Sequence, residues 1–82
     1  MSLGLYLFNA LPLNERAEAL WKDGTFLLAT DHPKGRSAFY AFADYWVEVL
    51  MEGEEQRIAE VVPFRTGERL ERLLSVIDPA KL

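Results

Sequence analysis

The sequence offers few residues that could carry acid–base, nucleophilic or metal chemistry. It contains one histidine, His32, and no cysteine. A zinc site with two or more histidines and a thiol nucleophile are therefore excluded within one chain. The segment around His32 (TDHPKGR, residues 30–36) has the composition of an ordinary turn. We therefore expect His32 to lie in a solvated loop.

Glu48 and Glu60 form the one pair of carboxylates that neighbouring predicted strands could bring together. Two convergent acids can share a proton or hydrolyse a glycosidic bond. Strand alternation, however, predicts that Glu48 shares a face with Trp46 and that Glu60 shares the other face with Val62. We therefore expect no acid–base pair.

Other catalytic patterns are also missing. The glutamates around Gly53 form too short a loop for a calcium site of the EF-hand type. No serine stands in a Gly-x-Ser-x-Gly motif, and no glycine-rich phosphate loop is present. We therefore expect neither an enzyme nor a bound cofactor.

Three arginines form a candidate anion site. Arg65, Arg69 and Arg72 have the spacing i, i+4, i+7, so they can share a face near the start of the last predicted helix. Double-stranded-RNA-binding domains have a similar order of elements and place cations there. The lysine cluster of that family is missing, Glu68 and Glu71 interrupt the arginines, and the net charge is −4. RNA binding is thus the weakest functional alternative.

Periodicity predicts the helices that would position these residues. Apolar residues recur at helical spacing over 13–22 and again over 67–77, which predicts one amphipathic helix in each segment. Pro79 forbids much continuation of the second helix. The segment Leu3–Ala10 fits a helical turn and a short strand about equally well.

Four segments carry strand patterns: residues 25–32, 37–43, 45–52 and 57–64. Residues 38–43 are all apolar, which is typical of a central strand covered on both faces. A hairpin loop at Gly53 would bring Met51 opposite Ile58. The sequence therefore predicts one α+β domain over residues 1–82. Its order is a helix, a three- to four-stranded antiparallel meander and a C-terminal helix, arranged as a two-layer sandwich.

The predicted sheet has more apolar surface than two helices can cover. Four strands are about 19 Å wide, which two packed helices just span. We therefore expect an uncovered face made of Trp46, Leu50, Val61 and Phe39, with Glu48 at its border. A patch of this kind is typical of an interface. The simplest partner is a second copy.

Several alternatives to a homodimer through this face stay open. The segment 3–8 or the loop 31–36 of the same chain can cover it. The face can also be the aromatic groove of a small-ligand or peptide binder. A protein partner can add a strand to an open edge of the sheet. We expect a non-catalytic interaction or assembly module, and a small-ligand or peptide binder is the alternative function.

Composition sets the broad class. The chain has 82 residues, half of them hydrophobic, which predicts one small folded domain. The apolar opening residues 1–13 lack a basic segment and a cleavage site, so we do not expect a signal peptide. No stretch reaches the roughly 20 apolar residues of a membrane span. We therefore expect a cytoplasmic protein that does not enter a membrane.

Several segments of the sequence resemble those of a family of small bacterial proteins of unknown function. The resemblance rests on GLYLFNALPLNER (4–16), LW (20–21), GTFL (24–27), YWVEV (45–49) and PFR (63–65). It spans nearly the whole chain and implies a stand-alone cytoplasmic protein. It implies no activity and no site residues.

Overall fold

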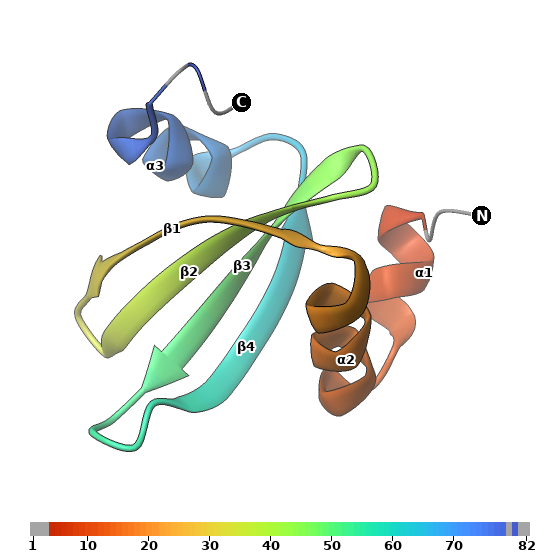
Figure 1. Ribbon diagram of the computed structural model, residues 1–82, viewed down its shortest axis with the longest axis horizontal. Helices are drawn as coiled ribbons and strands as arrows, with labels where there is room; N and C mark the ends of the chain where they lie inside the picture. Colours follow the sequence, from red (N-terminus) through yellow and green to blue (C-terminus); the bar gives the residue numbers. More distant parts are fainter. Residues whose placement is uncertain (1–3, 79, 81–82) are drawn as a thin grey trace.

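The computed structural model describes residues 4–78 and 80 (Figure 1). The elements in chain order are α1 (Leu5–Ala10), α2 (Leu13–Asp23), β1 (Thr25–His32), β2 (Gly35–Phe42), β3 (Tyr45–Glu52), β4 (Arg57–Phe64) and α3 (Glu68–Val76). The predicted α+β class and the order of helix, meander and C-terminal helix are confirmed. Leu3 and Pro79, on which parts of the prediction rested, lie outside the described residues.

The four strands form one antiparallel sheet in the order β1-β2-β3-β4. The short turns between them keep strands that follow one another in sequence side by side, which is the simplest meander. β2 lies between β1 and β3, so the strand predicted to be central from its continuous apolar run is central. The edges of the sheet are β1 and β4.

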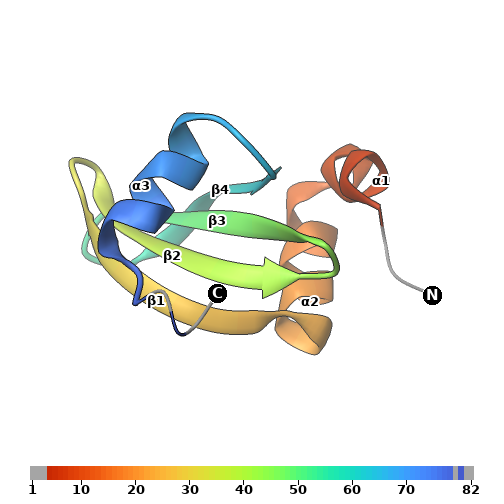
Figure 2. The ribbon, with the colours of Figure 1, turned by 90° about the horizontal axis from the view of Figure 1, so that it is seen from above.

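Each face of the sheet packs against its own helices. On one face, Phe8 of α1 and Leu20 of α2 join Val47 and Val49 in a buried cluster. On the opposite face, Leu73 of α3 and the following Ile77 pack with Phe39 and Phe64, and Trp46 packs against that cluster. Figure 2 shows α3 on one side of the sheet with α1 and α2 on the other. We call these surfaces the α2 face and the α3 face.

The prediction that both helices cover the same face is wrong. The chain forms a third helix, α1, from the opening segment, whose sequence fits a helical turn and a short strand about equally well. The connection over residues 65–67 then carries the chain from the end of β4 onto the α3 face (Figure 1). The α3 face, which the sequence predicted to be uncovered, is therefore packed against a helix of the same chain.

A β-bulge in β4 overturns part of the predicted strand alternation. Met51 pairs with Ile58 as predicted, but Leu50 pairs with Glu60, so that Ala59 is an extra residue. One extra residue moves every following side chain to the other face of the sheet. Val61 therefore lies on the α2 face, and Glu60 lies on the α3 face with Glu48. The predicted sides of Val61 and Glu60 are both wrong.

The packing of α3 yields a stability prediction with a matched control. Leu73 is completely buried, whereas its neighbour Leu74 is 50% exposed. We expect Leu73→Ala to lower the free energy of unfolding by roughly 2–5 kcal/mol, because it leaves a cavity beside Phe39. We expect Leu74→Ala to change it by about 0.5 kcal/mol or less. Urea denaturation measures both values, and equal losses would contradict the packing of α3 described here.

Candidate functional site

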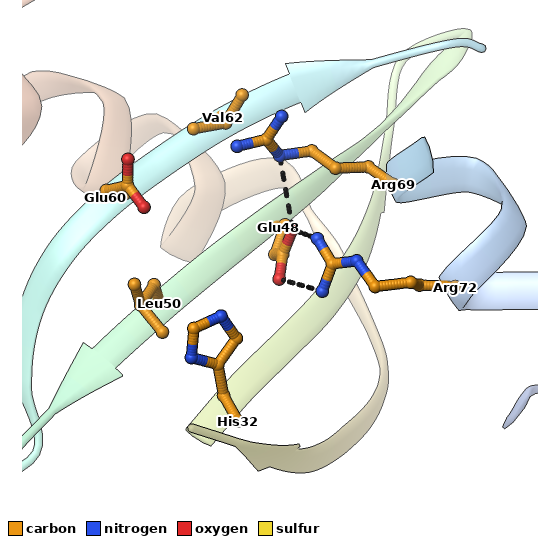
Figure 3. Close-up of a pocket in the computed structure, with 7 residues that line it drawn as sticks. All are labelled: His32, Glu48, Leu50, Glu60, Val62, Arg69 and Arg72. Atoms are coloured by element: carbon orange, nitrogen blue, oxygen red, sulfur yellow. Dashed lines mark hydrogen bonds and ion pairs between the residues drawn. The ribbon is translucent and has the colours of Figure 1, made fainter. Parts of the chain in front are cut away.

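A buried carboxylate under α3 is the most polar feature of the core. Glu48, near the middle of β3, is only 5% exposed. Arg72 donates hydrogen bonds from Nη2 to Oε1 at 2.6 Å and from Nη1 to Oε2 at 2.9 Å. Arg69 Nε lies 3.2 Å from Oε1, and the Ser37 hydroxyl donates to Oε2 at 2.6 Å. Figure 3 shows both guanidinium groups converging on the carboxylate. We call these four residues the Glu48 cluster.

The secondary structure dictates how the Glu48 cluster forms. Glu48 pairs with Phe39 across β2 and β3, so its side chain points from the sheet toward α3. Arg69 and Arg72 are three residues apart on α3, which places them on the same side of that helix. A carboxylate buried without partners would cost several kcal/mol. The two arginines of α3 and Ser37 of β2 supply those partners.

The electrostatics of Glu48 keep it ionised. Burial is the largest single effect on its pKa and raises it, because it disfavours the charged form. The hydrogen bonds from Arg72 and Ser37 and the charges of both arginines act in the opposite direction and prevail. The pKa of Glu48 therefore lies below its ordinary value of 4.5. The same pairing raises the pKa of Arg72.

The three arginines predicted as an anion site do not share one site. Arg65 makes hydrogen bonds of 2.9 and 3.0 Å to the carboxylate of Asp44. Arg69 and Arg72 both face Glu48 instead. Each of the three cations thus has a carboxylate of the same chain beside it, which reduces the charge available to an outside anion.

A cavity of about 40 Å³ lies beside the Glu48 cluster and is also lined by Glu60, Leu50 and His32 (Figure 3). Its volume matches that of about one water molecule. Glu48 and Glu60 share this face, contrary to the prediction, because of the bulge at Ala59. Acid–base work needs a carboxyl group that takes up a proton near the working pH. Glu48, held as an anion by two arginines, is poorly suited to that role.

Metal binding has no support in the part of the chain that the structure describes. Residues 4–78 and 80 contain no group of three or more histidine, aspartate or glutamate side chains placed to hold a metal ion. The prediction that His32 lies in a solvated loop is wrong, because His32 is the partly buried last residue of β1 and lines the cavity. Its Nδ1 atom accepts a hydrogen bond from the backbone N–H of Lys34 at 3.1 Å.

The residues predicted to form an interface are mostly core residues of this chain. Phe39 and Val61 are completely buried, and Glu48 and Leu50 are each 5% exposed. Trp46 keeps partial exposure and stacks on Phe64 with 6.1 Å between ring centroids. Helix α3 thus provides the cover that was assigned to a partner, and Val61 lies on the other side of the sheet.

A larger and more apolar opening than the cavity at Glu48 lies on the α2 face. An open groove of about 440 Å³ runs beside α2 and is lined by Leu13, Asn14, Ala17, Glu18, Trp21, Arg57 and Ile58. We call it the α2 groove. Its lining is mainly apolar, and its two charged lining residues are Glu18 of α2 and Arg57 of β4. This groove is the best candidate for a binding surface.

Exposed aromatic rings extend the α2 groove toward β1. Trp21 is 51% exposed and Phe26 is 55% exposed. The ring of Tyr40 lies between them, 5.4 Å from Trp21 and 5.5 Å from Phe26 by ring centroids. The sequence does not reveal this cluster, because Trp21 fits the apolar stripe of its helix. One feature of the sequence could have indicated the cluster: Trp21 is the last apolar residue of the stripe. A large side chain at the end of a helix can extend past the sheet that the helix covers.

Comparisons with known proteins give no match. No family model, no curated protein and no solved structure matches this chain. The resemblance to a small bacterial family therefore stays a prediction. In the described part of the chain, no helix has the length and apolar character needed to cross a membrane.

The Glu48 cluster predicts a marked loss of stability when the carboxylate is neutralised. Glu48→Gln keeps the shape of the side chain but leaves two guanidinium groups facing a neutral amide. Both arginine side chains are about 40% exposed, so water screens part of the effect. We expect a loss of roughly 1–3 kcal/mol in unfolding free energy by urea denaturation. The matched control is Glu60→Gln on the same face, where the side chain is exposed and the expected change is about 0.5 kcal/mol or less.

The lowered pKa of Glu48 also predicts how stability depends on pH. A carboxyl group that binds protons less readily when folded adds stability above its unfolded pKa, and this contribution disappears as the pH falls through the folded value. We expect wild-type protein to lose more unfolding free energy than Glu48→Gln between about pH 6 and about pH 3. If the unfolding free energy fell equally in the two proteins over this pH range, the ion pairs of Glu48 would be contradicted.

Proposed function

We propose that this chain is a non-catalytic interaction module that associates with a second copy through the α2 groove. The observation that carries the proposal is the half-exposed Trp21 beside an open apolar groove. Tryptophan is strongly enriched among the residues that dominate binding energy at protein interfaces. An apolar centre with charges at its border is also the usual composition of an interface.

The groove is favoured over strand addition because both edge strands are irregular. β1 has a bulge at Leu27 and β4 has one at Ala59. Pro63 lies within β4 and cannot donate a backbone hydrogen bond. Bulges and prolines are devices that keep sheet edges from pairing with other strands. The side-chain surface beside α2 is therefore the better docking site.

A small apolar ligand is the second candidate occupant. The volume of the α2 groove falls within the range of roughly 300–1,000 Å³ that is usual for ligand pockets. A ligand present at 100 times its dissociation constant would raise the unfolding free energy by about 2.7 kcal/mol. A thermal-shift screen with apolar compounds detects such a gain and separates this candidate from self-association.

A charged substitution in the groove tests self-association. We expect Trp21→Glu to raise the dissociation constant of a dimer at least about tenfold, because it places a charge in the apolar contact. Leu74→Glu is the matched control, since Leu74 is 50% exposed but lies on α3, which packs on the other face of the sheet. Light scattering over a concentration series gives the masses. A wild-type mass of one chain at every concentration would overturn the proposal.

A further inference from the structure

Helix α1 exposes apolar side chains that nothing in the described chain covers. Tyr6 is 85% exposed and Leu7 is 65% exposed. Phe8 is completely buried between Phe42 and Tyr45, with ring centroids 5.2 and 5.9 Å away, and so anchors the helix to the sheet. α1 is therefore a fixed projection with apolar side chains on its outside.

The charge pattern of α1 suits it to an apolar groove. Its six residues, LYLFNA, include no charged side chain. Apart from Trp21, which lines the groove itself, the exposed large apolar residues on the other described helices are Leu74 and Val76 of α3, whose sequence ERLERLLSV carries four charges. Moving charges out of water costs free energy unless they are paired. α1 can enter a groove without that cost, whereas α3 would carry Glu68 and Glu71 with it, which form no ion pair with another described residue.

The lining of the α2 groove includes two charges that suit a second copy. Glu18 and Arg57 are both exposed, and neither forms an ion pair with another described residue. In a two-fold dimer the same surface meets itself, so a contact between residue i and residue j occurs twice. An acid on α2 and a base on β4 can then pair reciprocally between copies.

We infer that the occupant of the α2 groove is helix α1 of a second copy, with Tyr6 and Leu7 as its anchors; this rests on the proposed function. α1 and the groove both belong to the α2 face of the sheet, because Leu5, Leu13 and Ile58 pack on the same core cluster. Two copies related by a two-fold axis fill both grooves at once. Glu18 of each copy then faces Arg57 of the other.

The first experiment substitutes the anchor. We expect Leu7→Asp to raise the dimer dissociation constant at least tenfold in analytical ultracentrifugation. Leu74→Asp, a leucine of similar exposure on α3, is expected to leave it unchanged. Circular dichroism and the urea midpoint check that both variants fold. If Trp21→Glu dissociates the dimer while Leu7→Asp does not, α1 is not the occupant and the proposed function stands.

The second experiment exchanges the charges of the α2 groove between copies. Glu18→Arg and Arg57→Glu are each expected to weaken their own homodimer, because each brings like charges together twice. A mixture of the two variants restores both ion pairs, so we expect its dissociation constant to be at least tenfold lower than that of either homodimer. If the dissociation constant of the mixture is no lower than that of either variant alone, the two-fold arrangement is overturned.

Discussion

The buried carboxylate of Glu48 constrains the whole α3 side of the molecule. A charge at the centre of a sheet face must be paired, because the hydration it loses is worth several kcal/mol. Arg72 and Arg69 lie on α3, so the pairing fixes where that helix sits and which side of it faces the sheet. The apolar contacts of Leu73 with this face then form in one arrangement. The ion pairs determine how α3 is oriented on the sheet, while the buried Leu73 and its neighbours supply most of the hydrophobic stabilisation.

Because α3 covers that face, the open apolar groove of the molecule lies on the other face of the sheet, beside α2. α1 and α2 are joined by only two residues, and α2 leaves part of the face beside Ile58 open. The expectation that one face of the sheet has no helix of its own is wrong, because α3 lies on one face and α1 and α2 lie on the other. Exposed large apolar side chains lie on α1, at Trp21 and at Phe26, and also on α3 at Leu74 and Val76. The proposed self-association is one way to cover both the projection and the groove.

Local patterns predicted the elements well because local forces determine them. The apolar period over 13–22 gives α2, the uninterrupted apolar run gives the central strand β2, and the Gly53 turn gives the pairing of Met51 with Ile58. The faces on which the β4 side chains lie were predicted wrongly after Ala59. A bulge at Ala59 depends on how β4 fits its neighbour and its covering helices, and a strict alternation of side chains cannot reveal it.

The sequence by itself determined the class of fold, the order of the elements and the lack of cysteine and of a second histidine. These follow from side-chain chemistry and from periods of two or 3.6 residues, which each segment carries alone. Only the tertiary structure decided that α3 lies opposite α1 and α2, that Glu48 meets Arg72, and that Trp21 is exposed while Phe39 is not. An amphipathic helix fits either face of a sheet that is apolar on both sides. The choice between the faces depends on pairing a buried charge with partners 21 and 24 residues away in the chain.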